Sequence, residues 1–380
     1  MQTRKTDESV QRNQVTKLVD STAMREISSP AIQPKNSQRG SRVLFALFVV
    51  SLSGVLSSCA KSMPQNALAP EGEFAEKTHR LFVPVAGIAG VVFVLVQGLI
   101  VVAVLKYRRR DDAEAPKQIH GNAKMEIGWT ITPALILLVV GVFTIGTVAD
   151  LSHRPAKADN PLQVKVIGHQ WWWEYIYDTN ANGRFDDADV HTANTLVMPT
   201  ARPVDIHLTS EDVEHNFWVP KLAGKIYAIP GRINHLTLQA KLVKEYRGQC
   251  SEFCGLSHAN MRVRVQTMKE TDFESWLEAQ RQGPVNAVGA AASSGRLLFV
   301  QKGCSGCHSI TGIAKGKVGP NLTHLQSRHV FAGALFPLDD ANLRRWLRNP
   351  PAEKPGSKMP NLGLTENEIT DLISYLDTLE

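Results

Sequence analysis

The chain has 380 residues, a formal net charge of +6 and five cysteines, with 43% hydrophobic and 21% charged residues. This composition excludes a wholly disordered or fibrous protein, and the length indicates two or three domains. Five cysteines in so long a chain exclude a disulfide-dense scaffold, and the odd number means that at least one thiol has another role. A basic balance raises nucleic acid or a membrane surface as a partner.

The first 58 residues carry most of the positive charge. They hold eight Lys and Arg against four acidic residues, which leaves only +2 for residues 59–380. A polar stretch ends at Arg42, an apolar run follows over 43–56, and small residues precede Cys59. This order is typical of an export leader, and the sequence Leu56-Ser-Ser-Cys59 resembles a bacterial lipobox. We expect a leader over 1–58 and acylation of Cys59, the alternative being a plain signal or short anchor with an idle thiol. Nucleic acid is then not an expected partner.

Residues 81–105 and 127–149 are apolar runs without a charged side chain. Each is long enough to cross about 30 Å of hydrocarbon as a helix, whereas a buried soluble helix is seldom uncharged over such a length. The segment Lys106–Arg110 between them is strongly basic, so the positive-inside rule places it in the cytoplasm. The sequence therefore predicts a transmembrane hairpin over 81–149, with residues 59–80 and everything after 150 outside the cytoplasm.

The pattern changes to short, alternating, β-branched segments over residues 160–282. Turn-forming residues separate them, which predicts an antiparallel β-sandwich closed by a helix over 271–282. Small residues over 283–293 indicate a linker. Residues 294–380 are helical in pattern, and Thr365 with Glu368 forms a predicted capping box ahead of an apolar helix face. The chain is therefore expected to be multi-domain.

The sequence Cys304-Ser-Gly-Cys307-His308 has the spacing of covalent c-type haem attachment. The two thiols would form thioethers to the porphyrin, and His308 would bind the iron. Met359 is the only methionine after His308, and a thioether is a common second axial ligand. The competing axial ligands are His324 and His329, and the competing interpretation of the motif is a redox dithiol.

The segment around this motif resembles a class I cytochrome c. The resemblance includes Gly319-Pro-Asn-Leu322 and a helix whose Gly295 and Phe299 are positioned to meet Tyr375. It covers residues 294–380 and implies an all-α haem domain.

A second cluster of soft ligands lies over residues 250–261. Cys250, Cys254, His258 and Met261 fall within twelve residues, and His215 lies further upstream. Sulfur and imidazole ligands on a β-sandwich favour copper over magnesium or calcium, and two thiolates can bridge two copper ions. The alternative is a disulfide between the two cysteines, with the histidine and methionine as packing residues.

Residues 75–282 resemble cytochrome c oxidase subunit II. The similarity rests on the stretches 125–133, 168–175, 215–220 and 250–261. It implies a two-helix transmembrane hairpin followed by a cupredoxin-like antiparallel β-sandwich. The C-terminal class I cytochrome c domain, fused to this arrangement, points to the caa-type branch of the family.

The resemblance also implies site residues. The binuclear copper A centre would be held by the side chains of His215, Cys250, Cys254, His258 and Met261 and by the backbone carbonyl of Glu252. The Glu252 carboxylate matches a ligand to magnesium at the interface with subunit I. Trp171 matches the exposed aromatic where electrons enter from cytochrome c, and Glu126 matches the carboxylate at the mouth of a proton pathway. From the residues alone, Glu126 could instead be a solvated helix cap and Trp171 a core aromatic.

By this resemblance the chain is subunit II of a terminal haem-copper oxidase in the bacterial cytoplasmic (inner) membrane, with the copper and haem domains on the periplasmic side. Electrons from a soluble or membrane-bound cytochrome c, or a cytochrome complex, would reach its own haem, then copper A, then haem in subunit I. There oxygen is reduced to water and protons are pumped. The implied partners are subunits I and III and membrane lipid. Quinol is a poor donor candidate, because quinol-oxidising relatives lack the copper ligands. The alternatives are a stand-alone electron carrier and a copper-handling protein.

One stretch departs from the family pattern and resembles a calcium-binding loop. Oxygen-bearing side chains recur at loop positions 1, 3, 5, 9 and 12, with Gly183 at position 6. These side chains are Asp178, Asn180, Asn182, Asp186 and Asp189. A solvated hairpin loop is the alternative.

Overall fold

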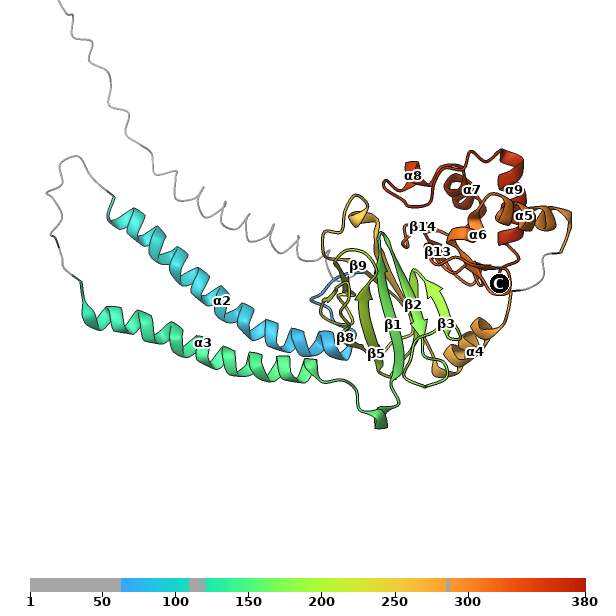
Figure 1. Cartoon of the computed structure of the whole chain (residues 1–380). Helices are drawn as coiled ribbons and strands as arrows, with labels where there is room; N and C mark the ends of the chain where they lie inside the picture. The colour runs from blue at the N-terminus through green and yellow to red at the C-terminus, as the bar shows by residue number, and fades with distance from the viewer. Residues whose placement is uncertain (1–62, 109–117, 119–120, 285–287) are drawn as a thin grey trace, which may run out of the picture. The chain divides into compact units, whose positions relative to one another are not determined.

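The computed structural model describes residues 63–108, 118, 121–284 and 288–380 (Figure 1). The predicted leader and Cys59 lie outside the described residues. Three regions follow one another along the chain: a pair of long helices, a β-sandwich and a mostly helical C-terminal region.

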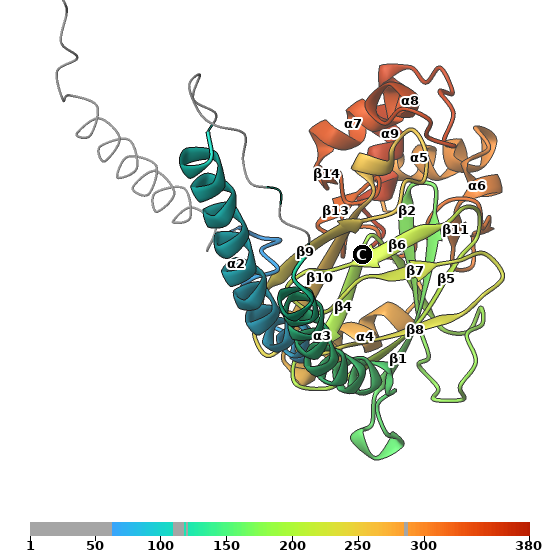
Figure 2. The same cartoon turned by 90° about the vertical axis from the view of Figure 1, so that its left-hand side faces the viewer.

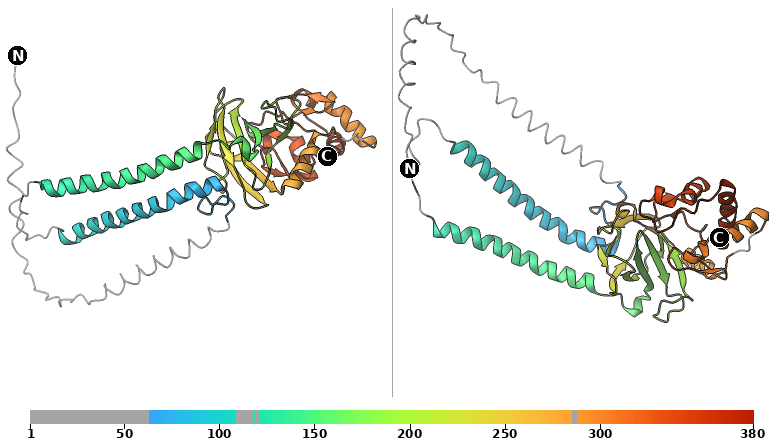
Figure 3. Two further views of the ribbon diagram at one scale, coloured as in Figure 1. Left: turned by 90° about the horizontal axis from the view of Figure 1, so that it is seen from below. Right: turned by 45° about the horizontal axis from the view of Figure 1, so that its top comes forward.

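The helical pair consists of α2 (Glu73–Lys106) and α3 (Ala123–Ser152), which lie side by side (Figure 3). Within the described residues these two helices are long and apolar enough to cross a membrane, and their large apolar side chains are exposed. Both helices are longer than the predicted uncharged runs, because polar residues lie at both of their ends. Lys77 in the first turns of α2 pairs with Asp150 near the end of α3 at 3.1 Å, and Asn122 caps α3 by accepting from the Met125 amide.

Two five-stranded sheets form the sandwich (Figures 1 and 2). The first has the order β3-β2-β1-β5-β8, with strands Val190–Ala193, Trp172–Tyr177, Leu162–His169, Val204–Ser210 and Asn234–Leu238. The second has the order β4-β10-β9-β6-β7, with strands Thr195–Pro199, Arg262–Met268, Glu245–Cys250, His215–Trp218 and Ile226–Ala228. Most neighbours are antiparallel as expected, but β1 pairs with β5, and β4 with β10, in parallel. Alternation along a strand reports which face is buried and carries no information about the direction of its neighbour.

The core lies between the sheets. Val164 and Val166 of β1 lie beside Ile206 and Leu208 of β5 in the first sheet, and all four side chains are fully buried. Burying such a side chain contributes roughly 1.5–3 kcal/mol. Helix α4 (Glu270–Arg281) closes one end with Phe273, close to the predicted span 271–282.

The C-terminal region contains α5 (Ala290–Gln301), α6 (Cys304–Cys307), α7 (Asp340–Arg348), α8 (Pro350–Glu353) and α9 (Glu366–Leu376). Two short hairpins join them, formed by β11 (Ser309–Ile310) with β12 (Ala314–Lys315) and β13 (Val330–Phe331) with β14 (Phe336–Pro337). Single 3-10 turns, η1 (Lys157–Asp159) and η2 (His258–Asn260), lie in the sandwich region. The predicted capping box is confirmed: the Thr365 hydroxyl accepts from the Glu368 amide at 3.3 Å, and the Glu368 carboxylate accepts from the Thr365 amide at 2.8 Å.

Helices α5 and α9 pack closely, as the sequence predicted. Phe299 meets Tyr375 with ring centroids 5.8 Å apart. Gly295 is buried where the helices cross, and a Cβ there would collide with the Asp371 carbonyl and lie 2.8 Å from the Tyr375 Cβ.

Replacing Gly295 by alanine is expected to destabilise the C-terminal helical region by about 1–3 kcal/mol, because backbone rather than a flexible side chain opposes the added methyl. Chemical unfolding, followed by the absorbance of the predicted haem, measures this. The control is Ser294→Ala, an exposed position on the same helix. Equal midpoints for the two variants would contradict the packing argument.

Candidate functional site

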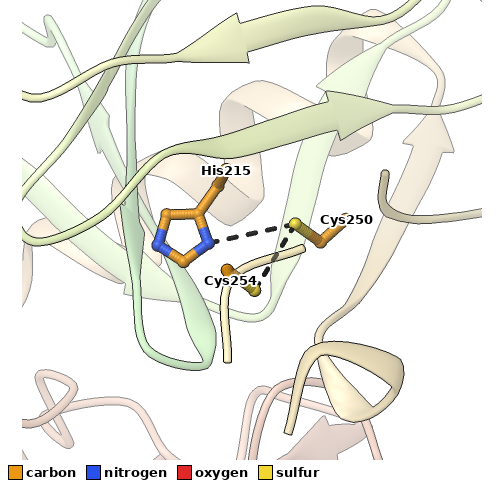
Figure 4. A group of neighbouring side chains, drawn as sticks. All are labelled: His215, Cys250 and Cys254. Carbon is orange, nitrogen blue, oxygen red and sulfur yellow. Dashed lines mark hydrogen bonds between the residues drawn. The ribbon is translucent and has the colours of Figure 1, made fainter. Parts of the chain in front are cut away.

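Three of the predicted copper ligands, His215, Cys250 and Cys254, come together beside strands of the second sheet (Figure 4). His215 opens β6, and Cys250 ends the adjacent β9, so the two strands bring residues 35 positions apart into contact. The Cys250 Sγ lies 3.9 Å from the His215 Nδ1 and 3.8 Å from the Cys254 Sγ, and all three residues are buried.

The loop after β9 brings in the remaining donors. The Cys254 Sγ is 3.5 Å from the His258 Nδ1 and 3.9 Å from the Met261 Sδ. The Glu252 carbonyl oxygen is 3.3 Å from the Cys250 Sγ. All six predicted copper ligands therefore gather in one place.

This donor set fits copper. Two free thiols, two imidazoles, a thioether and a carbonyl converge, and soft donors of this kind select copper ions. Hydrogen bonds from the Cys254 thiol and from His215 lower the pKa of Cys250 against the effect of burial. This favours the thiolate, which is the form that binds metal.

Asp212 supports this centre, although the sequence did not single it out. Its Oδ1 lies 2.9 Å from the His215 Nε2, which leaves the Nδ1 facing the thiols. Burial alone would raise the pKa of Asp212, but hydrogen bonds from His215 and from the Gln170 and Val213 amides hold it well below its usual range. A carboxylate behind a ligating imidazole fixes its tautomer and orientation.

The haem-attachment motif forms one wall of an apolar pocket. Cys304, Cys307, His308 and Met359 all line it. The His308 Nδ1 donates to the Pro320 carbonyl at 2.8 Å, and burial lowers its pKa, so the ring is neutral with its Nε2 free for iron.

Two further observations show that this pocket fits a haem. Gly319 leaves the His308 ring its space, since a Cβ there would lie 2.6 Å from the ring. Arg328 lines the same pocket while buried, and its Nε has no partner among the described residues. A propionate would satisfy that group. His324 instead contacts the Gln282 and Glu380 carbonyls, and neither it nor the exposed His329 lines the pocket within the described chain.

Trp171 lies between the two sites. Its indole nitrogen donates to the Cys254 carbonyl at 3.0 Å, and the residue also lines the haem pocket. The expectation of an exposed aromatic is not met, because Trp171 is only 6% exposed. The haem domain covers it: Gly356 lies so close that a Cβ would come 2.6 Å from the indole ring.

Several hydrogen bonds hold this cover in place. Lys354 is buried, and its ammonium donates to the Trp171 carbonyl at 2.5 Å and to the Ala332 carbonyl at 2.7 Å. Burial lowers the pKa of Lys354 to about 7. Ser257, in the copper loop, donates to the Pro355 carbonyl at 2.6 Å. A buried amine satisfied by carbonyls of both regions indicates a specific contact.

The other predicted residues lie apart from these two sites. Glu126 is exposed in the first turn of α3. In the loop resembling a calcium site, Asp178 accepts from the Gly183 amide at 2.9 Å, and Asp189 accepts from the Thr179 and Asp186 amides at 3.1 and 3.0 Å. Gly183 has φ +74°, which explains the glycine at the turn.

Fold and sites together define a membrane-anchored electron-transfer protein with a thiolate metal centre and a c-type haem domain. Family models for the transmembrane and periplasmic domains of cytochrome c oxidase subunit II match residues 63–146 and 162–268, and a cytochrome c model matches residues 292–380. The subunit 2 of Alkalihalophilus pseudofirmus cytochrome c oxidase is 34% identical over 330 residues, covering 86% of this chain and 94% of that protein. The chain belongs to the cytochrome c oxidase subunit II family.

A second relative is similar over most of this chain. The Bacillus subtilis cytochrome c oxidase subunit 2 is 31% identical over 359 residues, covering 89% of this chain and 98% of that protein. The solved periplasmic domain of subunit II of Bradyrhizobium japonicum cytochrome oxidase is 30% identical, with a TM-score of 0.29, covering 32% of this chain and 93% of that one. The protein is thus part of cytochrome c oxidase, with an electron-transfer role and a periplasmic domain on a membrane anchor. The subunit II domain implies copper A, and the cytochrome c domain implies haem c.

Sequence reasoning missed Asp212, Lys354 and Arg328. Asp212 could have been suspected from its position three residues before a predicted ligand. Nothing marked the other two, because lysine and arginine are usually exposed and only tertiary packing buries them.

Proposed function

We propose that this chain conducts electrons from cytochrome c to the oxygen-reducing subunit, entering at its own haem, continuing to copper A and leaving to haem in subunit I. The haem is attached through Cys304 and Cys307 with His308 and Met359 as axial ligands. The copper is held by His215, Cys250, Glu252, Cys254, His258 and Met261. Copper A, when bound, supplies a one-electron carrier that changes little in structure between its redox states.

Trp171 is the observation that carries this proposal. This one residue lines the haem pocket and donates from its indole nitrogen to the backbone of a copper ligand, so a continuous path of contacts joins the two sites. Gln170 donates to the same Cys254 carbonyl at 2.8 Å, which fixes the loop against the tryptophan. Burial of the indole excludes water from the path, and the Lys354 and Gly356 contacts hold the haem domain against it.

A flash-reduction experiment tests this route. In the purified oxidase, the haem is reduced by a light-activated donor, and haem and copper absorbance are followed together. The haem should become oxidised as the copper is reduced, at a rate independent of protein concentration, because donor and acceptor belong to one chain. A rate proportional to concentration, or direct reduction of copper ahead of haem, would rule the route out.

The remaining assignments complete the proposal. Subunits I and III are the partners in the cytoplasmic membrane, with the copper and haem domains on the periplasmic side. The Glu252 carboxylate binds magnesium at the subunit I interface, and Glu126 stands at the mouth of a proton pathway. Cys59 carries a lipid anchor after removal of the leader, and oxygen reduction in subunit I is coupled to proton pumping.

Calcium binding to the 178–189 loop is the proposal most easily tested. Adding calcium to the full chain should raise the melting temperature of the sandwich by about 2–4 °C, if binding contributes about 1 kcal/mol. Asp178→Asn should remove the shift. Asp187→Asn, which alters an exposed carboxylate outside the ligand positions, should keep it. Unchanged melting of the unsubstituted chain on calcium addition means that the loop is only a hairpin.

A further inference from the structure

Three side chains with metal-ligating atoms lie together on the outward face of the first sheet. His207 of β5 is directly opposite His235 of β8 in the antiparallel register, and their ring centroids are 4.7 Å apart. Asp205 precedes His207 by two residues and so projects from the same face. One ligand atom from each of the three lies within 4.8 Å of the others. This cluster lies outside the copper and haem sites.

The carboxylate of this cluster is not fully satisfied. The Asp205 side chain is only 3% exposed, and its Oδ1 has no hydrogen-bond partner among the described residues. This oxygen lies 3.8 Å from the His235 Nδ1, while the Oδ2 lies 3.7 Å from the His207 Nε2. Leaving a buried acceptor without a hydrogen bond destabilises the folded protein. A cation between the three side chains would satisfy it.

Arg154 supplies a positive charge to the cluster at present. Its Nε and Nη2 donate to the Asp205 Oδ2 at 3.1 and 2.6 Å, and the Nη2 lies 3.2 Å from the His207 Nε2. The Arg154 side chain is 48% exposed and belongs to the segment between α3 and β1, so it can move into solvent without disturbing the sheet. Gln163 of β1 lies beside Asp205 of β5, and its Oε1 is 2.8 Å from the His207 Nε2. This uncharged oxygen offers a fourth ligand atom.

We propose that Asp205, His207 and His235 form a zinc site, in which the ion takes the place of the Arg154 guanidinium. Two imidazoles and a carboxylate are a common zinc donor set. With bonds of about 2.0–2.1 Å, a tetrahedral ion separates its ligand atoms by about 3.3 Å. The 3.7 Å separation from His207 to Oδ2 and the 3.8 Å separation from His235 to Oδ1 are each within about half an ångström of this value, and one ligand atom from each of the three residues lies within 4.8 Å of the others. His235, at 35% exposure, opens the site to solvent.

Zinc titration of the full chain tests the proposal. The protein is loaded with copper and haem, so that the thiolate centre is filled, and zinc binding is followed by calorimetry. The unsubstituted chain should bind one zinc ion, and the substitution His235→Gln should abolish this binding. Arg154→Gln should tighten binding about tenfold, because it removes a competing charge a few ångströms from the ion.

His153→Gln is the matched control, since it removes an exposed histidine beside Arg154 that lies outside the cluster. It should leave zinc affinity unchanged. Copper and haem absorbance verify that each variant is folded. The proposal is overturned if the loaded chain binds no zinc, or if His235→Gln binds zinc as the unsubstituted chain does. Unchanged affinity in Arg154→Gln would overturn the exchange with the guanidinium.

Discussion

Replacing Cys254 by serine should eliminate the copper centre and lower oxidase turnover more than about 100-fold. The Cys254 sulfur contacts three of the other donors, those of Cys250, His258 and Met261, and a serine hydroxyl is a poor ligand for copper. Losing a residue behind a ligand typically costs 10–100-fold, so losing a sulfur that would itself hold the copper should cost more. Copper content per chain and turnover with cytochrome c as donor measure the effect.

The matched control is the neighbouring Phe253, whose side chain is exposed and holds no donor atom. Phe253→Leu should retain copper and turnover, and both variants should keep the haem spectrum, because the haem pocket does not contain residue 253 or 254. Copper bound at the normal level in Cys254→Ser would show that this sulfur is not a ligand.

Trp171→Phe should slow electron transfer from haem to copper by roughly 10- to 100-fold. Phenylalanine keeps an aromatic ring but loses the indole nitrogen that donates to the Cys254 carbonyl. It also leaves a gap beneath Gly356, where the haem domain rests on the indole. A displacement of about 1 Å in a reacting site can cost as much as 100-fold in rate. Flash reduction of the haem in the purified oxidase gives the intramolecular rate directly.

Trp172→Phe separates this role from a general effect on the pocket. Trp172 also lines the haem pocket, but it stacks on His169 with centroids 4.2 Å apart. Its substitution should change the rate little. If both variants transfer electrons from haem to copper as fast as the unsubstituted chain, Trp171 is not on the path. If both variants are slowed equally, the effect is not specific to Trp171, and this residue is again excluded.

Features that depend on a short stretch of chain could be predicted from the sequence. Two uncharged runs of sufficient length predicted α2 and α3, and the alternating pattern predicted the buried faces of β1 and β5. The capping box of α9 joins Thr365 and Glu368, which are only three residues apart, so it could be predicted from local sequence. The positions of the helix ends were less predictable, because α2 starts at Glu73, in a turn stabilised by contacts with Lys77 and with the sandwich.

The copper ligands were partly predictable in the same sense. Cys250, Cys254, His258 and Met261 are neighbours in sequence, and their types suggested copper. His215 could be named only as a distant histidine, and the resemblance alone assigned it to the copper, since nothing local links it to a loop 35 residues later. The pairing of β6 with β9 makes that link. The parallel direction of β1 and β5 was likewise decided by the whole sandwich.

Residue types and their spacing by themselves predicted the organisation of the protein: an export leader, a transmembrane hairpin, a thiolate metal centre and a haem-attachment motif. These are covalent or local properties, set by residue type and spacing. Only the tertiary structure decided that Trp171 is buried under Lys354 and Gly356, and that His207 and His235 stand opposite each other beside Asp205. Those contacts join residues distant in sequence, and their free energy comes from burial and register that no single segment contains.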